Sequence, residues 1–372
     1  ISDKMELLSS GTDSIKATET LLIRASAIGT AIRLGSAAGV DSDAGSGTLA
    51  LTDLEVAALN DTSGLIQFGA AGSRGATTIA SGGTTLTINA PLAFVVTSLG
   101  FASAGDALAT DSTFVIDATG AITDAPGNDL TTDITATDFT IIAATTVGIT
   151  ADDAINLSVN NLRLTTTGNV FLTEADGVGL RKLDTGANSL YLRALGGNLT
   201  NSRTIDDDLN IVAGNLTLIT DGVNGAIGAS GIATNMDVQL GGSLTAKAMN
   251  GNGGIFISET GNTSVGLIDA GSGIIELDST GSIDEAINDN SVKVITSGTA
   301  RWNAQGAIGV SAGVATTEPL DVQIGTLIAH VTPNAGGIFL KNTGDITLAD
   351  LDTIVGNIEI QSTGGIVAVD VL

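Results

Sequence analysis

Short segments of alternating apolar and polar residues, bounded by glycine, recur along the chain and predict β-strands. The clearest is residues 253–261 (GGIFISETG), which returns as residues 336–344 (GGIFLKNTG) and more loosely as residues 168–174 (GNVFLTE). Side chains alternate along a strand, so Ile255 faces one side of it and Phe256 the other. A strand this short cannot bury its apolar face alone, and we expect it to stack on copies of itself.

The predicted strands after residue 168 are evenly spaced. Most steps between strand starts are about 19 residues long, and a longer step of about 28 residues occurs at every fourth interval. This pattern gives a super-repeat of about 84 residues. The tripeptide DVQ at 237–239 returns at 321–323, and AIG at 226–228 returns at 307–309. The strands begin near Val170, Ser189, Leu209, Met236, Ile255, Ile274, Val292, Leu320, Ile338 and Ile358.

A unit of about 19 residues with two or three short strands predicts one coil of a parallel β-helix. We therefore predict an all-β chain that forms a single continuous β-solenoid. Ile255, Ile274, Ile338 and Ile358 are expected inside the coils, with Thr, Ser, Asn and Asp outside. The main alternative is an antiparallel sandwich, or a string of small sandwich domains, but that architecture gives no reason for a short step nested inside a much longer period.

One short helix is expected in the least regular part of the chain. Thr52 could cap a single helical turn, with Leu54, Ala57 and Ala58 on one face. By regularity the chain divides into irregular N-terminal coils at 1–63, less regular β-helix coils at 64–167, and coils with the super-repeat at 168–372.

Composition adds limits to this prediction. Aromatic residues make up only 3% of the chain, which favours a core of Ile, Leu, Val and Ala. The net charge of −26 makes nucleic acid and anionic lipid poor partners. There is no cysteine for a disulfide, and no apolar run approaches the roughly 20 residues of a membrane span. The start at Ile1 and the unfinished coil at 364–370 lead us to expect a processed product or a piece of a longer protein.

The glycine-bounded words give the chain a family resemblance. GNVFL at 168–172, GGIFI at 253–257, the GSI turn at 281–283 and the stretch 48–60 resemble the repeat regions of filamentous-haemagglutinin-type adhesins and of very large bacterial surface proteins. The resemblance covers most of the chain and lies in the type and spacing of its repeats, not in a diagnostic motif. It implies a right-handed β-helix, export to the cell surface and a structural or adhesive role. It supplies no active-site residue.

A periodic set of outward aromatic residues is the main candidate contact surface. A large apolar side chain on the outside needs a cover. The long coils at 221–235 and 305–319 could supply that cover within the chain, and the alternative is contact with another copy or another surface-matrix component. Glycans are a further candidate partner. The candidate contact residues are Phe171, Tyr191, Phe256 and Phe339.

Acidic clusters raise the question of calcium, which takes six to eight oxygen ligands. The calcium-binding nonapeptide and the EF-hand loop are both absent, so solvated turns are the better interpretation and no cofactor is predicted. The clusters are Asp41 with Asp43, Asp152 with Asp153, and Asp206 with Asp207 and Asp208.

An enzyme must also be considered, because β-helices host polysaccharide lyases and hydrolases. Those reactions need paired carboxylates, or a carboxylate with a basic partner, and no pair stands at a distinctive spacing. Aromatic side chains that could stack on a sugar are scarce, because the chain has one tryptophan, Trp302, and one tyrosine, Tyr191. The sole histidine, His330, is expected on an outer strand face. We predict an elongated extracellular structural or adhesive protein, not an enzyme. A β-helical polysaccharide-degrading enzyme is the alternative.

Overall fold

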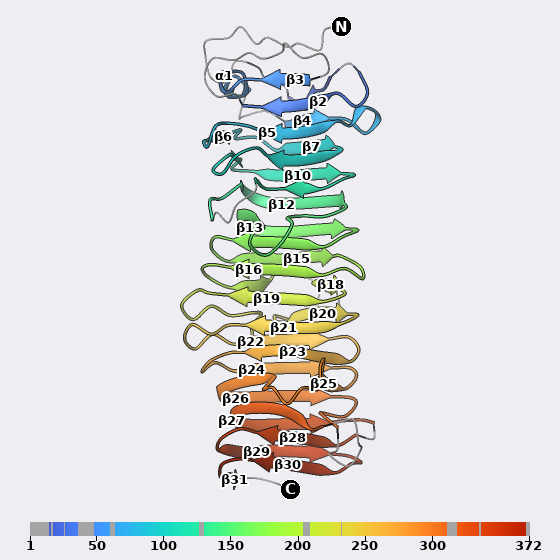
Figure 1. Ribbon diagram of the computed structural model, residues 1–372, viewed down its shortest axis with the longest axis vertical. Helices are drawn as coiled ribbons and strands as arrows, with labels where there is room; N and C mark the ends of the chain where they lie inside the picture. Colours follow the sequence, from blue (N-terminus) through green and yellow to red (C-terminus); the bar gives the residue numbers. More distant parts are fainter. Residues whose placement is uncertain are drawn as a thin grey trace. The chain divides into compact units, whose positions relative to one another are not determined.

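The computed structural model is nearly all-β, with parallel strands stacked as a β-solenoid of about 13 turns and roughly 22 residues per turn. The predicted fold class is therefore confirmed. The chain clusters into two compact units, residues 1–175 and 176–372, whose strands are stacked within each unit (Figure 1). The structure describes residues 15, 18–25, 27–35, 48–59, 64–125, 130–203, 209–231, 233–310, 318–334 and 336–369.

The first unit has three columns of parallel strands. The first column contains β1 (Thr20–Ile23), β4 (Leu65–Gly69), β7 (Leu92–Val96), β10 (Thr113–Ala118), β12 (Ile134–Ala144) and β13 (Ile155–Thr166). The second contains β3 (Thr48–Leu51), β2 (Ala31–Leu34), β5 (Ala76–Ile79), β8 (Ser98–Phe101) and β11 (Ile122–Thr123). The third contains β6 (Thr85–Thr87), β9 (Ala107–Ala109), the first halves of β12 and β13, and β14 (Val170–Glu174).

A ladder of phenylalanines fills the interior of the first column. Phe68, Phe94, Phe114 and Phe139 are at most 1% exposed, and successive ring centroids are 5.2, 5.3 and 5.4 Å apart. The expectation of a purely aliphatic core was wrong here. Few aromatic residues are needed, because each coil adds one ring and the rings pack on one another. Phe68 is in register with Phe94, and Phe114 with Phe139, whereas Phe94 and Phe114 are offset by two positions.

The predicted helical turn is α1 (Asp53–Ala57), and a 3₁₀ turn, η1, covers Ala71–Ser73. The Thr52 hydroxyl accepts from the Glu55 N–H, and the Glu55 carboxylate accepts from the Thr52 N–H, so the expected N-cap is part of a capping box. The expected buried face was wrong in part. Val56 and Ala58 are buried, whereas Leu54 is 79% exposed.

The second unit has two main columns. The first contains β16 (Leu190–Ala194), β19 (Leu216–Thr220), β21 (Ser243–Lys247), β23 (Thr263–Asp269), β25 (Ile283–Glu285), β28 (Ile338–Asn342) and β30 (Ile358–Ser362). The second contains β15 (Val178–Asp184), β17 (Leu199–Asn201), β18 (Ile211–Ala213), β20 (Met236–Leu240), β22 (Ile255–Glu259), β24 (Ile275–Ser279), β26 (Val294–Ala304), β27 (Leu320–Val331), β29 (Ile346–Thr353) and β31 (Ile366–Ala368). The first residues of β26 and β27 reach into the first column.

Coils of the second unit differ in length because some contain an excursion. The coil from Ile227 to its partner Ile255 is longer than the coil from Ile255 to its partner Ile275. The longer coil leaves its column after Ile227 and returns at Met236, and both residues pair with β22. The predicted step of about 19 residues is thus near the short coils but below the average of roughly 22 residues per turn.

Two of the four isoleucines expected inside the coils need correction. The inward residue of β24 is Ile275, which is fully buried, and not Ile274. Ile358 is in register with inward Ile338, but it is 41% exposed. Ile255 and Ile338 are buried as predicted.

The super-repeat corresponds to a specific local structure. Ile227 and Ile308 each form a single bridge to the strand that carries the outward Phe, at Ile255 and Ile338 respectively. Each is followed by a glycine with φ of 68°. Val147 forms the same bridge to Val170 in the first unit, and Gly148 follows it with φ of 67°.

Successive super-repeats of the second unit lie in different columns. From Ile255, three coils lead to Leu327 in the same column. Ile338 follows half a coil later and pairs with Ile358 in the other column. The predicted period therefore equals about three and a half coils, so a residue and its counterpart one period later belong to different strand columns.

Candidate functional site

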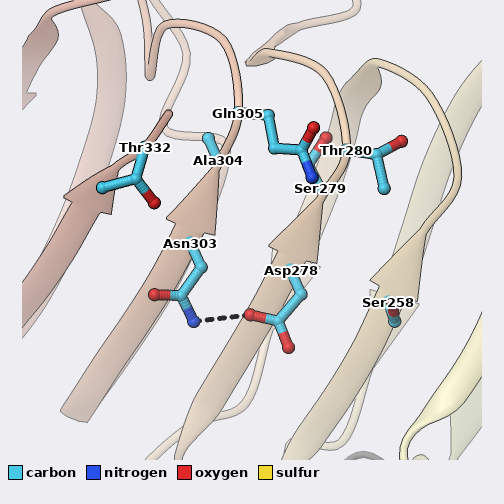
Figure 2. Close-up of a pocket in the computed structure, with 8 residues that line it drawn as sticks. All are labelled: Ser258, Asp278, Ser279, Thr280, Asn303, Ala304, Gln305 and Thr332. Atoms are coloured by element: carbon cyan, nitrogen blue, oxygen red, sulfur yellow. Dashed lines mark hydrogen bonds between the residues drawn. The ribbon is translucent and has the colours of Figure 1, made fainter. Parts of the chain in front are cut away.

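A polar groove on the outer side of the second column is the candidate site of the second unit. Parallel strands β22, β24, β26 and β27 bring their outward side chains into rows, because residues in register lie about 4.8 Å apart on neighbouring strands. The groove has a volume of about 240 Å³. Its lining is Ser258, Asp278, Ser279, Thr280, Asn303, Ala304, Gln305 and Thr332 (Figure 2).

A chain of side-chain hydrogen bonds crosses the coils beside the groove. Asn303 Nδ2 donates to Asp278 Oδ1 over 2.6 Å, from one strand to the next (Figure 2). Asn303 Oδ1 lies 3.3 Å from His330 Nδ1 on β27, and His330 Nε2 lies 3.2 Å from Asp350 Oδ2 on β29. His330 is half-buried on the outward side of β27, between buried Ala329 and Val331, which is the orientation predicted for it.

Three side chains of the groove form no hydrogen bond with any described residue. Among the described residues, none donates to or accepts from the side chains of Ser258, Gln305 and Thr332. Asp278 is the only charged residue of the lining. The groove therefore offers hydroxyl and amide groups around one carboxylate, and no cation.

The candidate contact residues point outward but do not share one strand column. Tyr191 and Phe339 lie in the first column of the second unit, on β16 and β28, and Phe256 lies in the second column, on β22. Phe171 lies on β14 of the first unit. All four side chains are partly exposed. Their role in contacts with a partner stays a prediction.

Both outward phenylalanines of the second unit are partly covered from within the chain. A Cβ on Gly254 would collide with the ring of Phe256, and one on Gly337 would collide with the ring of Phe339, so each ring lies over the glycine two residues before it. Ser230 Oγ, in the excursion after Ile227, donates over 2.9 Å to Glu276, which is in register with Phe256. The predicted cover from the long coil at 221–235 thus reaches the neighbour of Phe256. Of the coil at 305–319, residues 311–317 lie outside the described part.

A buried polar residue follows each outward Phe by three positions, a feature that the alternation of apolar and polar residues did not predict. Glu259 Oε1 accepts from the Leu240 N–H over 2.9 Å, and Asn342 Oδ1 accepts from the Ile324 N–H over 3.0 Å. Both side chains are fully buried. Burial raises the pKa of Glu259 to about 8, although the Leu240 N–H acts in the opposite direction. Glu174 holds the same position in the first unit and accepts from the Val159 N–H.

Charged side chains gather where the chain leaves the first column between β25 and β26. Glu285 Oε1 accepts from the Asp321 N–H over 2.8 Å, and Lys341 Nζ lies 3.3 Å from Asp321 Oδ1. Lys293 Nζ lies 2.7 Å from Asp289 Oδ1. Burial raises the pKa of Glu285, although the hydrogen bond from the Asp321 N–H acts in the opposite direction. Hydrogen bonds from Lys293 and Ser291 lower the pKa of Asp289 to about 2. Lys341 Nζ also donates over 2.8 Å to Asn290 Oδ1, which fastens the excursion to β28.

The structure does not gather a metal-binding set from the part of the chain that it describes. Asp152 and Asp153 lie in a bend of the first unit. The clusters at 41–43 and 206–208 fall outside the described residues. Trp302 is fully buried in β26, so it offers no surface for stacking a ligand. Among the described residues, no helix is both long and apolar enough to cross a bilayer.

Comparison with known proteins gives the chain no relative. No family model, no curated protein and no solved structure matches it.

Proposed function

We propose that the chain is a structural and adhesive module of an extracellular bacterial surface or fibre protein, of the filamentous-haemagglutinin type that its repeat words resemble. The solenoid serves as a stiff scaffold. Its outward side chains contact other copies of the chain or other components of the surface matrix. The proposal rests chiefly on the difference between the two sides of each strand, since inward side chains form the core and outward side chains are available for contacts.

The difference between inward and outward side chains is clearest in β22, β24 and β28. Their inward residues Ile255, Ile275 and Ile338 are at most 1% exposed, and each backbone is paired to coils on both sides. Inward ladders and coil-to-coil hydrogen bonds leave the outward positions free to vary without cost to the fold. The outward positions that do recur are aromatic, at Phe256 and Phe339, and large apolar side chains kept on a surface are typical of contact sites.

The alternative of a polysaccharide-degrading enzyme draws less support. Glycoside hydrolysis needs two carboxyl groups about 5–10 Å apart, one on each side of the scissile bond. The lining of the polar groove has one carboxylate, Asp278, which is hydrogen-bonded to Asn303. The nearby Glu276 lies outside the lining and accepts a hydrogen bond from Ser230.

Self-association tests the proposal. Sedimentation velocity over a range of concentrations should show the wild-type chain forming assemblies, and negative-stain images of the same samples should contain laterally or end-joined particles. The double variant Phe256→Ser, Phe339→Ser should associate about tenfold more weakly, because two partly exposed rings are lost. Thr217→Ser, an outward residue of β19, is the matched control. A wild-type chain that stays monomeric at every concentration would contradict the assembly role.

A further inference from the structure

We propose that the polar groove binds a neutral oligosaccharide. Its floor is built from side chains on three successive coils, since Ser258, Asp278 and Asn303 are neighbours in register on β22, β24 and β26. The rim is formed where these strands end, by Thr280, Gln305 and Thr332 (Figure 2). The volume of about 240 Å³ is just below the range of ligand pockets, about 300–1,000 Å³, and suits a short segment of a polymer.

The hydrogen-bonding groups of the groove match the needs of sugar hydroxyls. A hydroxyl both donates and accepts, so it is best bound by a mixture of amides, hydroxyls and a carboxylate. Ser258 and Thr332 supply hydroxyls, Gln305 supplies an amide, and Asp278 supplies an acceptor. The uncommitted state of Ser258, Gln305 and Thr332 means that binding breaks no hydrogen bond between described residues.

Charge restricts the ligand to neutral sugars. The only charged residue in the lining is an aspartate. Outside the lining, Glu276 lies two residues before Asp278 on β24 and is in register with Arg301, which lies two residues before Asn303 on β26. The chain as a whole carries a net charge of −26. A uronate or sulfated sugar would be repelled from this surface.

Phe256 lies beside the groove but is not part of its lining. It precedes Ser258 by two residues on β22, so both side chains point outward on the same side. The ring lies over Gly254 and is partly exposed. The ring is therefore directed toward the start of β22 and away from Ser258, so the polar side chains of the lining carry the binding.

The second hollow of this unit provides a matched control. It has a volume of about 300 Å³, and its lining includes Gln323, Ile324 and Ile295. Gln323 and Gln305 are both exposed glutamines, and neither side chain is hydrogen-bonded to another described residue. Gln305→Ala removes an amide side chain from the polar groove, and Gln323→Ala removes the same chemical group from the second hollow.

Native affinity electrophoresis tests the inference. The folded chain is run through gels that contain dextran, galactomannan, laminarin, polygalacturonate or heparin. At least one neutral polysaccharide should retard the wild type, and the double variant Asn303→Ala, Gln305→Ala should raise the apparent Kd about tenfold, as expected for the loss of one or two hydrogen bonds. Gln323→Ala should migrate like the wild type.

Three results would overturn the inference. They are the absence of retardation by all three neutral polysaccharides, retardation by the anionic ones alone, and equal retardation of the wild type and the groove variant. A thermal unfolding scan of each variant confirms that the comparison is made on folded protein. Because the self-association test uses no sugar, this site and the scaffold role can fail independently.

Discussion

At the scale of single residues, the repeat is defined by glycines and buried polar groups as much as by Ile and Phe. Gly228 and Gly309 adopt φ of 68°, and a Cβ on either would collide with the carbonyl oxygen of the outward Phe on the next strand. Both requirements exclude other residues. The buried group three residues after the Phe varies in chemistry, from Glu259 to Asn342, but keeps its backbone hydrogen bond.

Glu259 makes the stability of the fold depend on pH. Its pKa is about 8 in the folded chain and near its ordinary value of 4.5 after unfolding. Between these values the unfolded chain releases a proton that the folded chain keeps, so stability falls as pH rises from about 4.5 to about 8. The slope is at most about 1.4 kcal/mol per pH unit for one proton. Below pH 4.5 the group has no effect, and above pH 8 its effect is constant.

The substitution Glu259→Gln tests this dependence. It keeps the acceptor for the Leu240 N–H and cannot ionise. The expected result is that the unfolding midpoint in urea falls less between pH 5 and pH 8 in Glu259→Gln than in the wild type. Glu276→Gln removes an outward carboxylate of β24 and should leave the wild-type dependence unchanged. Identical pH profiles for Glu259→Gln and the wild type would show that Glu259 ionises normally.

At the scale of the strand, the two units fill their interiors differently. The first column of unit one stacks four phenylalanine rings, whereas β22, β24 and β28 carry isoleucine at their inward positions. A parallel stack brings like residues onto neighbouring coils in either case, in register for Ile255 and Ile275 and offset by two positions for Phe94 and Phe114.

The phenylalanine ladder is expected to be the most sensitive part of the first unit. Phe94 is fully buried and contacts the rings of both Phe68 and Phe114. Phe94→Ala should cost about 3–5 kcal/mol of unfolding free energy, through lost burial and the cavity that remains. Phe94→Leu keeps most of the volume and should cost less. Chemical denaturation monitored by circular dichroism gives both values, and equal losses for Ala and Leu would refute a role for tight packing.

The sequence predicted the stacking but not its register. The alternation around Ile255 and Phe256 gave the correct inward and outward sides, because one side of every strand faces a dry interior. The longer coil that contains the excursion after Ile227 was predicted, but the coil from Ile275 to its partner Ala300 is longer than the predicted step of about 19 residues. The polar groove could not be predicted, because it depends on which strands become neighbours, and Ser258, Asp278 and Asn303 follow no shared spacing in the sequence.

At the scale of the whole chain, charge is the dominant property. The chain carries a net charge of −26. Folding brings its carboxylates closer together than they are in the unfolded chain, and their mutual repulsion opposes the folded state. The excess is only partly relieved by ion pairs such as Arg74 with Asp117 and Arg193 with Asp221. Exposed pairs of this kind contribute about 0–1 kcal/mol each.

Salt should therefore stabilise the chain by screening, without a specific ion site. Raising NaCl from 10 mM to 500 mM shortens the Debye length from about 30 Å to less than 8 Å, so the thermal midpoint should rise and then level off. CaCl2 and MgCl2 at matched ionic strength should raise the midpoint equally, because screening does not distinguish the two cations. Differential scanning calorimetry measures both series. A larger rise of the thermal midpoint with calcium than with magnesium, reversed by a chelator, would instead demonstrate a calcium site and would make the acidic clusters its candidate ligands.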